Sequence, residues 1–169
     1  FVKLMNEKYK DMFFVFHSTY EHSQLIKNLL NKKESFKNFE VISDEKIKFH
    51  VLKKSIFAVS KSGTISLEIC NAKIPSIILY KMNSINFFIV KMLVKVKFAN
   101  IINIAAGEEI IPELLQSKCN PKNIFKTVSK LLSDKQALEK QVRKSQVIIN
   151  GFRTDKSAEI ASSVLIKHL

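Results

Sequence analysis

Short apolar segments alternate with helical segments along the chain, and this alternation limits the fold more than any other feature. The apolar segments predict strands at residues 12–16, 39–42, 56–59 and 75–80. Helical patterns at residues 20–31, 45–54 and 65–72 lie between them. Strands that alternate with helices in this way are typical of a parallel sheet with crossover helices. The sequence therefore predicts an α/β fold with a Rossmann-like parallel sheet.

The remainder of the chain is mostly helical in pattern. A helix is expected at residues 2–9, before the first strand, and another at residues 84–96. Residues 99–104 are expected to be extended, and Pro112 is expected to start a short helix at residues 113–116. A C-terminal helical extension follows, with helices predicted at residues 121–132, 134–149 and 155–169.

The composition fits one domain without a metal centre. A chain of 169 residues that is 46% hydrophobic and 25% charged can bury a core and is not of the disordered class. Cys70 and Cys119 form no CxxC pair, and neither has a second ligand at metal-binding spacing. Two reduced thiols, no metal and no cofactor are therefore expected. The longest uncharged apolar run, residues 82–90, is too short to span a bilayer.

The net charge of +13 comes almost entirely from lysine, because Arg143 and Arg153 are the only arginines. This charge favours phosphate-bearing or acidic partners. Proteins that recognise nucleic-acid sequences usually depend on bidentate contacts from arginine, and no nucleic-acid-binding motif is present in this sequence. We therefore expect no nucleic-acid partner. A chain rich in Lys, Ile, Asn and Phe also reflects an AT-biased genome, so the charge alone identifies no ligand.

The turn after the third predicted strand is the strongest candidate site. Gly63 allows a tight turn, and the helix that follows directs free N–H groups and the positive end of its dipole outward, as in many anion sites. Thr64 and Glu68 are four residues apart and share a helical face. The pattern is compatible with a nucleotide site in which Ser62, Gly63 and Thr64 hold a diphosphate and Glu68 accepts the ribose hydroxyls. An ordinary helix start, with Ser62 as its cap and Glu68 in water, fits the same residues.

Four further residues are candidates for the lining of this site. Tyr80 ends the fourth predicted strand and can stack on a base, and Lys81 beside it can meet a phosphate. Asn103 and Gln116 carry amides that can read sugar or base edges. Each of them is also a common surface residue.

The predicted helix at residues 84–96 is apolar nearly all round, with Lys91 and Lys95 on its polar edge. Burial is the usual reason for such a helix. A partner subunit or an anionic membrane surface are the alternatives.

Taken in order, these motifs resemble the lipid-A-disaccharide synthases, which are glycosyltransferases of the two-domain GT-B type. The resemblance is clearest from about Val59 to Cys119, and weaker helical flanks extend it over nearly the whole chain. The residues that carry it are Ser62-Gly63-Thr64-x-x-x-Glu68, then Ala72-Lys73-Ile74-Pro75, Tyr80-Lys81-Met82, Leu93-Val94-Lys95-Val96, Asn103-Ile104-Ala105-Ala106-Gly107 and Pro112-Glu113-Leu114-Leu115-Gln116.

The resemblance implies an inverting transfer of 2,3-diacylglucosamine from UDP to 2,3-diacylglucosamine 1-phosphate, without an obligatory metal. It implies that this chain is the UDP-binding, C-terminal half of the enzyme, with Ser62, Gly63, Thr64, Glu68, Tyr80, Asn103 and Gln116 at the UDP-sugar. It also implies a lipid acceptor, the cytoplasmic surface of the inner membrane of a Gram-negative bacterium, and a homodimer that exchanges C-terminal segments.

The same resemblance sets the expected domain limits. Residues 1–150 would form a partial UDP-sugar-binding domain whose first strand and its Gly- and Arg-containing loop precede Phe1, and residues 151–169 a C-terminal helix. The chain is thus expected to begin part-way through a longer protein. The catalytic base would lie in the N-terminal half, so none is assigned here.

Three alternatives remain open at this stage. One is another GT-B enzyme with a UDP-N-acetylglucosamine-type donor, either a peptidoglycan glycosyltransferase or an epimerase. The second is a non-catalytic basic module that binds anions. The third is a decayed or split gene product.

Overall fold

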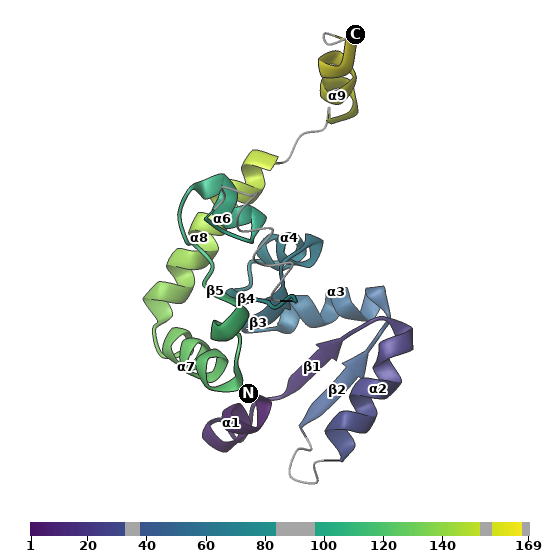
Figure 1. Ribbon diagram of the computed structural model, residues 1–169, viewed down its shortest axis with the longest axis vertical. Coiled ribbons are helices and arrows are strands. Elements are labelled where there is room, and N and C mark those ends of the chain that lie inside the picture. Colours follow the sequence, from purple (N-terminus) through teal and green to yellow (C-terminus); the bar gives the residue numbers. More distant parts are fainter. Residues whose placement is uncertain (33–37, 84–96, 153–156, 167–169) are drawn as a thin grey trace.

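The computed structural model describes residues 1–32, 38–83, 97–152 and 157–166 (Figure 1). Over these residues the fold is α/β, and every strand pair is parallel. The strands form two small sheets, one of two strands and one of three. The predicted class, a Rossmann-like parallel sheet with helices, is confirmed.

The two-stranded sheet pairs the first two strands, with Phe14 beside Phe39 and His17 beside Ile42. The helix between them packs on the second strand. The strand at residues 39–42 and the helices at residues 20–31 and 45–54 have the predicted bounds. The elements of this region are α1 (Val2–Lys8), β1 (Phe14–His17), α2 (Tyr20–Asn31), β2 (Phe39–Ile42) and α3 (Glu45–Lys54).

The three-stranded sheet has the order β3-β4-β5. Ala58 pairs with Ser76, and Ile78 pairs with Glu113. The third strand begins two residues later than predicted. The elements of this sheet and its crossover are β3 (Ala58–Lys61), α4 (Thr64–Asn71), β4 (Ser76–Tyr80) and β5 (Glu113–Leu115).

Two predicted segments are wrong. Residues 99–104 were expected to be extended, but Ile101–Ala106 is a helix, α6. The Asn100 side chain accepts a hydrogen bond from the Ile102 N–H, and Gly107 ends the helix in the left-handed conformation, so both helix signals were present. Residues 113–116 were expected to be a helix, but Glu113–Leu115 pairs with β4, because a free strand edge outweighs a local proline signal.

Helices cover both faces of the three-stranded sheet. Ile77 and Ile78 are consecutive in β4, fully buried, and point to opposite faces. Ile77 packs with Met5, Leu114, Ile124 and Val128, and Ile78 with Cys70, Ile102, Ile111 and Ile149. One face is thus covered by α1 and α7 (Pro121–Leu132), and the other by α4, α6 and α8 (Lys135–Phe152).

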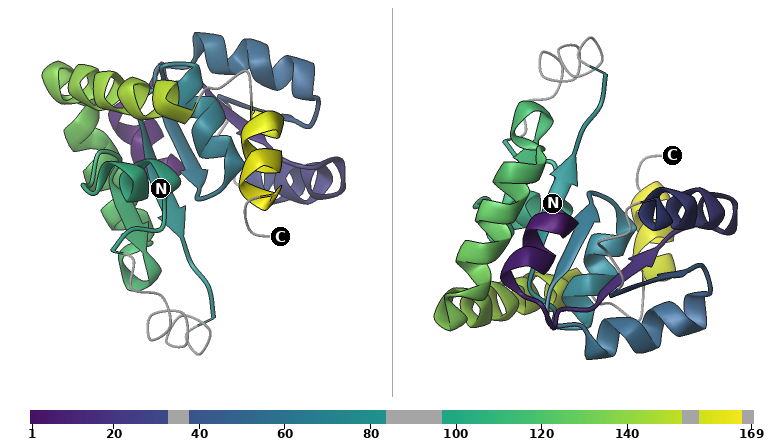
Figure 2. Two further views of the ribbon diagram at one scale, coloured as in Figure 1. Left: turned by 90° about the horizontal axis from the view of Figure 1, so that it is seen from above. Right: turned by 90° about the horizontal axis from the view of Figure 1, so that it is seen from below.

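All views place α7 and α8 on one side of the molecule and α2 and α3 on the opposite side (Figures 1 and 2). A 3₁₀ turn, η1 (Gln116–Lys118), links β5 to α7, and α9 (Ser157–Ile166) follows α8. The predicted helix at residues 84–96 lies outside the described residues. Within the part of the chain that the structure describes, no helix is long and apolar enough to cross a membrane.

Candidate functional site

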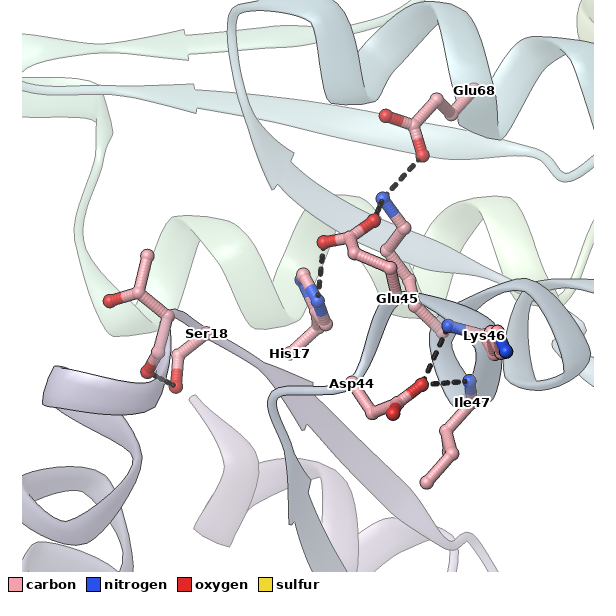
Figure 3. Close-up of polar contacts among 9 residues, drawn as sticks. His17, Ser18, Asp44, Glu45, Lys46, Ile47 and Glu68 are labelled. Atoms are coloured by element: carbon pink, nitrogen blue, oxygen red, sulfur yellow. Dashed lines mark hydrogen bonds and ion pairs between the residues drawn. The ribbon is translucent and has the colours of Figure 1, made fainter.

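The candidate site lies at the carboxyl ends of β1, β2 and β3. In open parallel sheets this edge is where ligands bind. His17 ends β1, Asp44 and Glu45 follow β2, and Ser62 and Gly63 follow β3. Figure 3 shows that His17 from the end of β1, Glu45 from the start of α3 and Glu68 from α4 lie close together.

Gly63 gives the turn after β3 its shape. Its φ of 153° and ψ of −167° belong to a region that residues with a Cβ rarely adopt. A Cβ at this position would meet no other atom within 4 Å, so there is open space beside the turn. Gly63 is the N-cap of α4, and its carbonyl accepts hydrogen bonds from the Ser66 N–H and hydroxyl.

Ser62 does not cap α4, although the alternative of an ordinary helix start required this. Its hydroxyl instead donates to the Ala99 carbonyl at 2.6 Å. The segment that carries Ala99 is held in turn by Glu113, whose carboxylate accepts the N–H groups of Ala99 at 2.7 Å and of Asn100 at 2.9 Å. The turn is therefore anchored to β5 through Ala99. Thr64, the first helical residue, is exposed.

Glu68 lies one turn into α4, and its side chain is 44% exposed. It lines a groove of about 270 Å³ between α3 and α4. The groove is also lined by Lys48, Phe49, Leu52, Lys53, Asn71 and Ala72. Glu68 is thus neither buried under packed side chains nor turned away from open space.

Glu68 belongs to a chain of polar contacts that sequence reasoning missed. Its Oε2 lies 2.7 Å from the Lys48 ammonium, which also contacts Glu45. The other oxygen of Glu45 lies 3.3 Å from His17 Nε2. The strand-end rule could have found His17, whereas nothing in the sequence separates Lys48 from the other lysines.

The charges within this chain of contacts stabilise one another. The hydrogen bond from Lys48 lowers the pKa of Glu45 below its ordinary value of 4.5. Hydrogen bonds to Glu45 and then Glu68 raise the pKa of Lys48 above 10.5, although burial acts in the opposite direction. The Glu45 carboxylate and the Lys48 ammonium are therefore both charged at neutral pH.

The other predicted site residues have different surroundings. Tyr80 is half-buried at the end of β4, with the Lys61 ammonium 5.7 Å from its ring centroid. The Gln116 amide pairs with the backbone of Met82, accepting its N–H at 2.8 Å and donating to its carbonyl at 3.2 Å. Lys81 is exposed.

Asn103 is fully buried, and its amide is used internally. Its oxygen accepts the N–H groups of Ile110 and Ile111, and its nitrogen donates to the Ile111 carbonyl and to Glu113. In this structure Asn103 is therefore a residue that ties α6 to β5.

No group of three His, Cys, Asp or Glu side chains among the described residues could hold a metal ion. Cys70 is a free, buried thiol whose pKa is raised by burial.

Comparison with known proteins gives a single family. The family model described as lipid-A-disaccharide synthetase matches residues 1–166. A lipid-A-disaccharide synthase of Rickettsia prowazekii is 34% identical over 169 residues, covering 98% of this chain and 43% of the relative. An enzyme of the same name from Sulfurihydrogenibium sp. is 37% identical over 117 residues, which cover 69% of this chain and 30% of the relative. Another from Gluconobacter oxydans is 45% identical over 84 residues, which cover 50% of this chain and 20% of the relative. The chain thus spans less than half the length of these relatives.

Proposed function

Because the chain belongs to the lipid-A-disaccharide synthase family, we propose that it is the part of such an enzyme that binds the UDP portion of the sugar donor. The reaction is the transfer of 2,3-diacylglucosamine from UDP to 2,3-diacylglucosamine 1-phosphate, with inversion and release of UDP. One observation carries the assignment: a glycine turn with open space beside it is followed, one helical turn later, by an exposed carboxylate at the edge of a groove.

The diphosphate binds at the start of α4. The first N–H groups of a helix have no acceptor within it, and the helix dipole adds positive charge at the same end. Gly63 lets an anion approach the backbone closely, since no side chain stands in the way. These groups stabilise the negative charge that develops on the departing UDP.

Glu68 binds the ribose. An ionised carboxylate only accepts hydrogen bonds, which suits it to the ribose hydroxyls, because these can donate. Tyr80 borders the site beside Lys61. Asn103 and Gln116 stabilise the site indirectly. Their amides form hydrogen bonds with backbone groups next to α6 and at Met82.

The domain itself is one strand short of a complete Rossmann-like sheet. Among the described strands, β1 pairs only with β2, and β3 only with β4. In the common doubly wound order 3-2-1-4-5-6, the order β2-β1 and β3-β4-β5 leaves room for one strand between β1 and β3. We place there a strand from outside residues 1–169. The proposed partial domain covers residues 1–150, and the C-terminal segment proposed to follow it, residues 151–169, contains α9.

The acceptor site and the general base belong to the portion of the enzyme that this chain does not cover. The chain spans only 43% of the length of the Rickettsia prowazekii relative. We therefore expect the isolated chain to have no transferase activity, and measurable turnover by it would contradict this assignment. We propose that the enzyme works at the cytoplasmic surface of the inner membrane, because its substrates are lipids, and that it forms a homodimer with exchanged C-terminal segments.

Saturation-transfer NMR of UDP with the purified chain tests the proposal directly. We expect transfer to the ribose protons in the wild-type chain and its loss in Glu68→Ala. Glu139→Ala removes an exposed carboxylate from α8, away from the site, and should change nothing. Failure of the wild-type chain to bind UDP, together with strongly salt-dependent DNA binding, would instead favour a basic anion-binding module.

Kinetics of the full-length enzyme sharpen the assignment. Glu68→Ala should raise KM for the UDP-sugar about tenfold and leave kcat nearly unchanged, because ribose contacts act equally on the ground and transition states. An unchanged KM would remove Glu68 from the site. A panel of radiolabelled acceptors separates this reaction from that of a peptidoglycan glycosyltransferase or an epimerase.

A further inference from the structure

Lys48 stands between the two carboxylates at the edge of the site. Its ammonium contacts Glu45 of its own helix and Glu68 of α4, with 2.7 Å between Nζ and Glu68 Oε2 (Figure 3). Two protein carboxylates therefore share one ammonium, and one of them is the proposed ribose ligand.

The position of Lys48 is fixed from both ends. Asp44 caps α3, accepting the N–H groups of Lys46 at 2.7 Å and Ile47 at 3.0 Å, so the first turn that carries Lys48 has a defined start. Glu45 is itself held by His17 at the end of β1, at 3.3 Å. Lys48 thereby connects the ends of β1 and β2 to α4.

Burial separates this ion pair from an ordinary surface pair. Exposed pairs contribute little, because water screens them and two long side chains lose freedom. The Lys48 side chain is only 12% exposed, whereas Glu68 remains 44% exposed. The lysine is therefore enclosed while its partner faces the groove, which suits a fixed cation that orients a ligand-binding carboxylate.

We propose that Lys48 is a positioning residue for the nucleotide: it holds Oε2 of Glu68 so that Oε1 faces the ribose hydroxyls. An ammonium has three N–H donors, and the two carboxylates take two of them. This inference rests on the proposed function, because it assigns a partner to the carboxylate of the same site.

The test uses the full-length enzyme and three variants of α3. Lys48→Met keeps the length of the side chain and removes its charge, and Lys48→Arg retains a cation that bridges two carboxylates. Lys46→Met is the matched control, because Lys46 is exposed two residues away and takes no part in the ion pairs described above for Glu45 and Glu68. The measurements are kcat, KM for the UDP-sugar, and Kd for UDP by calorimetry.

We expect Lys48→Met to raise KM and the Kd for UDP about fivefold to tenfold with kcat within about twofold, and Lys48→Arg to recover most of the loss. In a Glu68→Gln background, Lys48→Met should have no further effect, because the two residues act as one unit.

Three results would overturn the inference while the proposed function stands. The first is an unchanged KM in Lys48→Met when Glu68→Ala raises it. The second is a full additional loss in the double variant, since Lys48 would then act independently of Glu68. A lower kcat at unchanged KM, with a lower Tm, would also overturn it, because that pattern reports fewer folded molecules. Absence of UDP binding by the wild-type enzyme would contradict the proposed function itself.

Discussion

Strands β1 and β4 have similar apolar sequences and opposite environments. Ile77 and Ile78 of β4 are fully buried, one against each layer of helices. In β1, Phe14, Val15 and Phe16 are all partly exposed, and the preceding Phe13 is 59% exposed. A continuous apolar run is typical of a strand that is covered on both faces. The apolar sequence of β1 is thus typical of a strand that is more deeply buried than β1 is among the described residues.

The edges of the two strands explain this difference. β4 has a paired neighbour on each side, whereas β1 has one, among the strands that the structure describes. Neither α2 nor α3 has a fully buried residue. The candidate site lies where these two regions meet: the tightly packed one holds the glycine turn, and the loosely packed one contributes Lys48.

The largest expected effect compares the two strands directly. Ile78→Ala should lower the free energy of unfolding by about 3–4 kcal/mol, because it leaves a cavity in a closed core. Val15→Ala should cost about 1 kcal/mol or less, because its surroundings are already partly exposed. Urea unfolding of both variants measures the difference. Equal losses would mean that β1 is as well packed as β4.

The second comparison uses polar residues. Asn103→Ala removes four hydrogen bonds and leaves the N–H groups of buried Ile111 and partly buried Ile110 without an acceptor, so we expect a loss of about 3 kcal/mol in the free energy of unfolding. Asn38→Ala, in the other region, removes one surface hydrogen bond to the Lys10 carbonyl and should cost about 0.5–1 kcal/mol. A small loss in Asn103→Ala would show that water replaces its amide.

Local signals explain which elements the sequence predicted well. The bounds of α2, β2 and α3 were predicted because the residue pattern that defines each of them lies within the segment itself. β5 was missed because it forms only through long-range pairing of Glu113–Leu115 with β4. The role of Glu113 was missed for a similar reason, because its carboxylate accepts hydrogen bonds from N–H groups 13 and 14 residues earlier in the chain.

The residues of the candidate site also include some that the sequence predicted and some that it missed. The general rule about strand ends predicted the place of Gly63 and Glu68. It did not predict Lys48, because only the folded chain brings α3 beside α4. The burial of Asn103 was equally hidden, since an amide that reads a ligand and one that ties two backbone segments look alike in a sequence.

The third prediction concerns the turn between the two regions. Gly63→Ala should cost about 1–2 kcal/mol through backbone strain, although there is space for the methyl group. It should also weaken UDP binding, because the methyl group occupies the space proposed for the diphosphate. Gly151→Ala is the control: this glycine lies in α8, with open space around it and no unusual φ, and the change should stabilise the chain slightly. Unfolding and UDP titration of both variants measure these effects, and unchanged UDP affinity in Gly63→Ala would move the diphosphate elsewhere.

The smallest expected effect tests the link between the regions, through the pH dependence of Glu45→Gln. The folded-state pKa of Glu45 is lowered by Lys48, so its contribution to stability is present above about pH 4.5 and is lost as the pH falls through the lower folded value. The raised pKa of Lys48 makes its contribution complete below pH 10.5, with loss only above that. The wild-type chain should therefore have a slightly higher Tm than Glu45→Gln across neutral pH. This difference should disappear in strong acid and shrink in 1 M salt, where the screening length is about 3 Å. A difference that persisted in acid would mean that Glu45 joins the two regions through packing and not through its charge.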